Sequence, residues 1–171
     1  MDKGDHIREV YAHYGLAIYH AQVLEYGIVL SMTYFSLIPA NIGKISSQEH
    51  WAKLVDEHID GHLEKTLGGM IRSLALATSV PLHLKDLLAE SLSRRNWLVH
   101  SYFRERDAQF VTEAGRDEMI RELEDAQELF KRADLELEAV VAPLRERYGH
   151  TEDRLKEYYA EYLKEIGADQ P

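Results

Sequence analysis

Hydrophobic positions recur with helical spacing along almost the whole chain. Between residues 5 and 37, apolar side chains return every three or four residues, so they share one face of a helix. They are Ile7, Val10, Tyr11, Tyr14, Ala17, Ile18, Ala21, Leu24, Ile28, Met32 and Phe35. No stretch shows the alternation expected of a convincing strand. The pattern therefore predicts an all-α protein.

Turn and capping residues divide this pattern into further helices. Pro39 and Gly43 are expected to end the first helix, and Ser46 with Glu49 forms a capping-box pattern that opens a second helix reaching about Ile59. The fold expected is an up-and-down bundle of about four to six helices, in one domain spanning 1–171 with an extra C-terminal helix. The remaining helices are expected over 63–77, 82–106, 113–148 and 152–166.

The long helix expected over 113–148 carries a heptad seam. Its apolar residues alternate spacings of four and three, and Pro143 is expected to kink or interrupt its end. Such a seam serves either a bundle within one chain or a partner helix. Its members are Met119, Leu123, Ala126, Phe130, Ala133, Leu137, Val140 and Leu144.

Charge and composition narrow the classes of function. The formal net charge of −10 argues against a protein that coats nucleic acid through a general basic field, so any contact with nucleic acid must be local. Cysteine is absent, which excludes a thiol nucleophile. The start lacks a secretory leader, and the uncharged stretch 26–43 contains Ser31, Ser36 and Pro39. We therefore expect a cytoplasmic protein that does not enter the membrane.

The histidine spacings do not favour a metal site. His6, His13 and His20 recur every seven residues, which separates successive rings by about 10 Å along a helix, too far to share one ion. A solvated or interfacial stripe is the better interpretation. His58 and His62 are four apart, but Gly61 suggests that their helix is ending. No Glu-x-x-His pair of the di-iron type occurs, so no metal or other cofactor is expected.

Polar chemistry is concentrated in residues 93–104, SRRNWLVHSYFR. On a helix continuing to about residue 106, Arg95, Asn96, His100 and Tyr102 fall within the apolar arc or at its edge. Burying such groups is costly unless each is paired, and unexplained polar groups on a core face often mark functional sites. We take this stretch as the candidate active centre.

Glu25 projects into the apolar face of the first helix and must find a donor. It forms either a structural ion pair or hydrogen bond with a neighbouring helix, or it orients the arginine of the central motif. A buried carboxylate serves structure as often as function.

An arginine, an asparagine and a histidine at this spacing can cleave RNA without a metal. Arg95 would hold the charged phosphorus centre through its planar donors, and His100 would act as base or acid for attack by the 2′-hydroxyl. Asn96 would orient His100 or the phosphate. From the residues alone this is one hypothesis among several, and a satisfied polar network in the core explains the same pattern.

The segment RRNWLVHSYF resembles the Arg-x4-His motif of the HEPN superfamily, including the asparagine after the arginine and the tyrosine of the Arg-x4-His-x-Tyr form. The resemblance implies a helical bundle that dimerises, so that two motifs meet in one cleft. It also implies a metal-independent endoribonuclease of toxin–antitoxin or phage-defence systems.

By the family pattern, Arg95 and His100 would be catalytic and Asn96 supportive. Tyr102 corresponds to the tyrosine that a partner nucleotidyltransferase antitoxin modifies with AMP in some toxins. Basic residues would have to gather around the cleft to bind RNA, and Arg94, Arg104 and Arg106 could do so, although a solvated helix end explains them as well. The alternative is a non-catalytic HEPN-like module that binds nucleotide or a partner protein, which the heptad seam favours.

Overall fold

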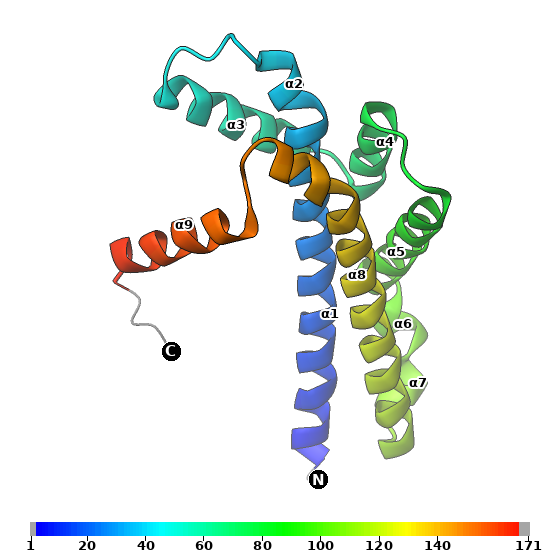
Figure 1. Cartoon of the computed structure of the whole chain (residues 1–171). Helices are drawn as coiled ribbons and strands as arrows, with labels where there is room; N and C mark the ends of the chain where they lie inside the picture. Colours follow the sequence, from blue (N-terminus) through cyan, green and yellow to red (C-terminus); the bar gives the residue numbers. More distant parts are fainter. Residues whose placement is uncertain (1–2, 168–171) are drawn as a thin grey trace. The chain divides into compact units, whose positions relative to one another are not determined.

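The computed structural model describes residues 3–167, and these contain helices and no strand (Figure 1). The prediction of an all-α protein is confirmed. In chain order the elements are α1 (Lys3–Met32), the π-helical η1 (Thr33–Leu37), α2 (Ile38–Asn41), α3 (Gln48–Leu63), α4 (Leu67–Ala77), α5 (Leu82–His100), α6 (Tyr102–Glu105), α7 (Asp107–Phe110), α8 (Glu113–Arg147) and α9 (Glu152–Glu165).

The chain forms two compact units, one up to Glu138 and one from Ala139 onward. In the second unit, Gly149 adopts a φ of 79° and Thr151 caps α9 by accepting a hydrogen bond from the Arg154 amide at 3.4 Å. This is the helix expected over 152–166. The expectation of one domain over 1–171 stays a prediction, and its ends, 1–2 and 168–171, lie outside the described residues.

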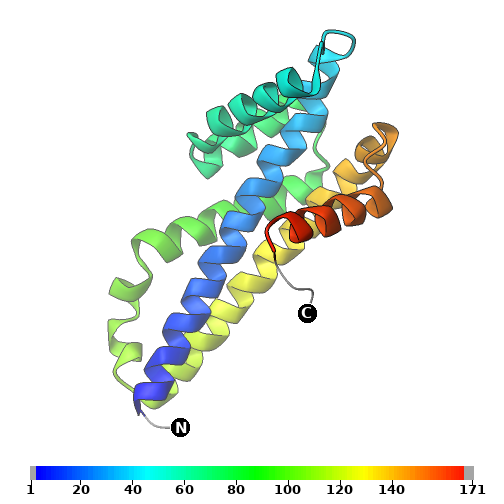
Figure 2. The ribbon, with the colours of Figure 1, turned by 90° about the vertical axis from the view of Figure 1, so that its left-hand side faces the viewer.

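In the first unit, α1 runs parallel to α8, and both views show the two side by side (Figures 1 and 2). His6 Nε2 lies 3.0 Å from Asp117 Oδ1, and the Gln127 amide donates to the backbone oxygen of His13 at 3.2 Å. Residue numbers rise together along both helices, which fixes the parallel direction. The histidine stripe is therefore interfacial, and His6 is buried.

The heptad seam of α8 is buried within the first unit as far as it extends there. Its six members before residue 139 are each no more than 2% exposed, so this part of the seam serves the bundle within the chain. They are Met119, Leu123, Ala126, Phe130, Ala133 and Leu137.

The opposite flank of α1 packs antiparallel against α5 and the turns that follow it. The Tyr14 hydroxyl donates to the Leu98 carbonyl at 3.2 Å, and the rings of Tyr11 and Tyr14 pack against Phe103. The segment 3–41 is the one helical stretch among the described residues that is apolar and long enough to cross a membrane. This segment contacts α4, α5 and α8.

Both ends of α3 differ from the sequence-based expectations. The N-cap of α3 is Ser47, which accepts from the His50 amide at 3.1 Å, rather than Ser46; the helix then continues past Gly61 to Leu63. A single central glycine weakens a helix by only about 1 kcal/mol, which tertiary contacts overcome. Likewise, α8 continues through Pro143, which is consistent with a kinked rather than a broken helix.

The central helix ends at His100, not near residue 106. Ser101 has φ −134° and ψ −22°, which are not α-helical values, and the short helices α6 and α7 follow. Residues after 100 therefore do not continue the face of α5. This break sets the geometry of the candidate site.

We expect Gly115→Ala to lower the free energy of unfolding by about 2 kcal/mol or more. A Cβ at this position would lie 2.2 Å from the Gln109 carbonyl oxygen, so the junction between α7 and α8 would have to open. Gly15→Ala is the matched control, because a Cβ there meets nothing within 4 Å and alanine favours the helix by about 0.5–1 kcal/mol. Urea unfolding of both variants measures this, and equal stability of the two would contradict the close approach.

Candidate functional site

Arg95 of α5 forms an ion pair with Glu25 of α1. Its Nε lies 3.1 Å from Glu25 Oε1, and the two side chains are 29% and 16% exposed. The contact is electrostatic, because the atoms are not aligned for a hydrogen bond and Glu25 Oε1 has none among the described residues. Glu25 thus meets the arginine of the motif.

The position of Arg95 follows from the helical repeat of α5. Leu84, Leu88 and Ser91 form the buried line of this helix, and Arg95 is the next position along it. A guanidinium on a core line would be costly to bury alone, and the carboxylate of Glu25 offsets that cost.

Arg95 keeps donors that the ion pair does not use. Its Nη1 reaches the side-chain oxygen of Asn96 at 3.4 Å, and its Nη2 has no hydrogen-bond partner among residues 3–167. An arginine has five N–H donors in a planar fork, so one edge remains able to bind an anion such as phosphate.

Asn96 and His100 are exposed side chains on α5, four residues apart. At about 100° per residue, they lie about 100° and about 140° around the helix from Arg95, outside the core face. The expectation that they fall within a buried arc or at its edge is therefore wrong, because the buried face of α5 is the one that carries Leu84, Leu88, Ser91 and Leu98. Solvent reaches the imidazole of His100, which terminates α5.

Tyr102 lies in the core of the unit. It is 1% exposed, its hydroxyl donates to the Met119 carbonyl at 3.0 Å, and its ring meets that of Trp97 edge-on at 4.8 Å. Burial, aided by the nearby Glu122 carboxylate, raises the pKa of this hydroxyl. Tyr102 thus ties α6 to α8, and we assign it a structural role.

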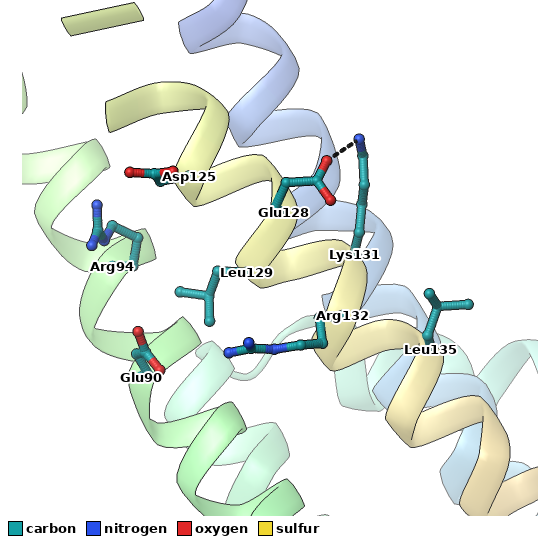
Figure 3. Close-up of a pocket in the computed structure, with 8 residues that line it drawn as sticks. All are labelled: Glu90, Arg94, Asp125, Glu128, Leu129, Lys131, Arg132 and Leu135. Atoms are coloured by element: carbon teal, nitrogen blue, oxygen red, sulfur yellow. Dashed lines mark hydrogen bonds and ion pairs between the residues drawn. The ribbon is translucent and has the colours of Figure 1, made fainter. Parts of the chain in front are cut away.

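Arg94 lines a groove of about 550 Å³ between α5 and α8 rather than the side that carries Asn96 (Figure 3). Glu90 from the same helix and Asp125 and Arg132 from α8 line it too. Arg94 also lies over the Trp97 ring, 5.4 Å from its centre. Because Arg94 and Asn96 are about 160° apart around the helix, one chain does not bring them together.

Arg104 and Arg106, the other two basic residues near the motif, differ in how exposed their side chains are and in how they are held. Arg104 is 76% exposed and donates to the hydroxyl of Ser101 at 3.1 Å, so it stays beside the end of α5. Arg106 is held by Glu122 through contacts of 2.7 and 2.8 Å. Arg104, which also lies 3.6 Å from a carboxylate oxygen of Glu105, is therefore the more exposed of the two.

A cleft of about 480 Å³ adjoins the ion pair on the outward side of α1. Tyr19 and Tyr26 in this cleft are 57% and 44% exposed. They were not among the site residues predicted from the sequence, because they lie off the apolar face of their helix. The only signal was a run of uncharged residues on an exposed side. The lining residues are Tyr19, Gln22, Val23, Glu25, Tyr26 and Leu63.

Among residues 3–167, no three His, Asp or Glu side chains are grouped closely enough to hold a metal ion. No family model matches the chain, and neither a curated protein nor a solved structure matches it.

We expect Glu25→Gln to lower the free energy of unfolding by about 1–3 kcal/mol, because it leaves the half-buried guanidinium without a counter-charge. In a double-mutant cycle with Arg95→Gln, the two residues should couple by about 1 kcal/mol or more. Lys53 and Glu57, exposed and 3.8 Å apart on α3, form the control pair, whose coupling should be close to zero. Equal coupling in both cycles would contradict a structural role for the Glu25–Arg95 pair.

Proposed function

We propose that this chain is a metal-independent endoribonuclease of HEPN type. The observation that carries the proposal is the arrangement at the end of α5. Arg95 is held by Glu25 and keeps unused donors, Asn96 lies 3.4 Å from it, and the exposed His100 is the last residue of the same helix. A fixed cation and an accessible imidazole near the end of one helix suit phosphoryl transfer, in which charge develops on phosphate oxygens while protons move.

The reaction follows from these roles. His100 takes the proton of the 2′-hydroxyl, whose oxygen attacks the adjacent phosphorus while the bond to the 5′-oxygen breaks. Arg95 stabilises the negative charge that develops on the phosphate oxygens, and Asn96 orients the phosphate. The leaving 5′-oxygen takes up a proton, and the products carry a 2′,3′-cyclic phosphate and a 5′-hydroxyl end.

A dimer provides the second proton-transfer group. One histidine cannot act as base and acid in the same step, and a second copy that places its motif in the same cleft supplies another imidazole. We propose a cytoplasmic homodimer acting in a toxin–antitoxin or phage-defence setting. If a nucleotidyltransferase antitoxin modifies Tyr102, the hydroxyl must first leave the Met119 carbonyl.

One observation favours the non-catalytic alternative, a dimeric module that binds nucleotide or a partner protein. Tyr102 and Arg95 both make contacts that stabilise the chain itself, so part of the motif serves structure whether or not RNA is cleaved.

In excess EDTA, the wild-type protein should cleave a mixed RNA substrate. His100→Ala should reduce the rate by about 1000-fold and Arg95→Ala by about 100-fold or more, because each removes one of the proposed roles. His83→Ala is the control, since His83 is a 63% exposed histidine at the other end of α5. Time courses on denaturing gels give the rates, and circular dichroism checks that each variant folds.

If His100→Ala cleaves as fast as the wild type, the mechanism is wrong. If the folded wild-type protein cleaves no RNA in EDTA, the non-catalytic binding module becomes the preferred interpretation.

The proposed dimer predicts a particle of twice the chain mass in sedimentation velocity at micromolar concentration. If the protein is a monomer throughout the concentration range in which it cleaves RNA, the proposal that two copies form one shared cleft is wrong.

A further inference from the structure

The cleft on the outward side of α1 shares a residue with the proposed active centre. Glu25 lines the cleft and also holds Arg95, with 3.1 Å between Oε1 and Nε. A ligand in the cleft therefore lies against the carboxylate that holds the guanidinium proposed to bind the scissile phosphate. Its volume of about 480 Å³ falls in the range of small-molecule sites.

Two tyrosines make the cleft suited to a flat ring. Tyr19 and Tyr26 are seven residues apart, so they project from the same side of α1 with about 10 Å between them along the axis. Both rings are about half exposed. Aromatic faces of this kind stack on unpaired bases, and each such contact strengthens binding to single strands.

Gln22 supplies a polar group between the two rings. It lies three residues after Tyr19 and four before Tyr26, lines the same cleft, and is exposed. An amide offers one acceptor and two donor hydrogens, which is what the edge of a base needs. The remaining wall, Val23 and Leu63, is apolar.

We propose that this cleft is a nucleobase subsite, which binds one unpaired base of the RNA next to the phosphate held by Arg95. The proposal rests on the proposed function, since the RNA is the substrate named there. It assigns Tyr19 and Tyr26 to stacking and Gln22 to the base edge. A negative chain that cannot attract RNA over its whole surface gains local affinity through such contacts.

A second copy of the chain is the rival occupant, because this side of α1 is uncharged from Ala12 to Leu30 apart from the paired Glu25. The cleft favours the base for two reasons. It is hollowed, with an amide and a carboxylate in its wall, and this carboxylate is the one that pairs with Arg95. A base attached to a phosphate satisfies both features at once.

The test measures RNA binding without cleavage. In a His100→Ala background, fluorescence anisotropy with a labelled single-stranded oligoribonucleotide gives Kd for Tyr19→Ala, Tyr26→Ala and Gln22→Ala. We expect the two tyrosine variants to raise Kd by about 5- to 100-fold each. Tyr26→Phe should retain most of the affinity because the ring remains. Tyr159→Ala on α9, whose ring is 63% exposed, is the control and should leave Kd unchanged.

The outcomes separate the subsite from the enzyme. If the wild type cleaves RNA but the tyrosine variants bind as the background does, the subsite is wrong and the proposed function stands. If binding depends on the tyrosines but no cleavage occurs, the subsite is supported and the proposal of RNA cleavage is wrong. If the variants change the sedimenting mass and not Kd, the cleft belongs to a second copy. No binding by any form overturns the subsite.

Discussion

The ion pair between Glu25 and Arg95 joins α1 to α5 where the core meets the surface. It allows the guanidinium of Arg95 to occupy a core line of α5 without an uncompensated charge. It also fixes the direction of the N–H donors of Arg95 that Glu25 does not use. Without the carboxylate, Arg95 would have to leave the interface or lose its charge partner, and a cation directed at a defined point would be lost. Precise placement matters because electrostatic catalysis depends on groups that are already oriented.

α1 is the element that every part of this arrangement shares. One flank carries the histidines that meet α8, and the other carries Tyr14 and Glu25, which meet α5. The outward side remains for the cleft around Gln22. The same helix therefore supports the bundle through two flanks and presents the proposed base subsite on the third side, with Glu25 at the boundary between them.

Local signals predicted much of the helical plan, because caps and apolar periodicity are properties of neighbouring residues. Thr112 and Thr151 cap α8 and α9, which begin at the expected residues, 113 and 152. The break at Ser101 was not predicted, since Tyr102 turns inward to reach Trp97 and Met119, contacts that local periodicity does not reveal.

Asn96 and His100 lie on the surface rather than in the expected core arc, because the buried face of α5 is the one that carries Leu84, Leu88, Ser91 and Leu98. The cleft was missed because Leu63 joins Tyr19 and Tyr26 only in the folded chain.

The most direct test of metal-free RNA cleavage is to identify the ends of the RNA that the wild-type protein produces in EDTA. Attack by the adjacent 2′-hydroxyl predicts a 2′,3′-cyclic phosphate on one fragment and a 5′-hydroxyl on the other, which mass spectrometry distinguishes from other ends. Fragments with 3′-hydroxyl and 5′-phosphate ends would contradict the account, because they require water rather than the 2′-hydroxyl as the attacking group.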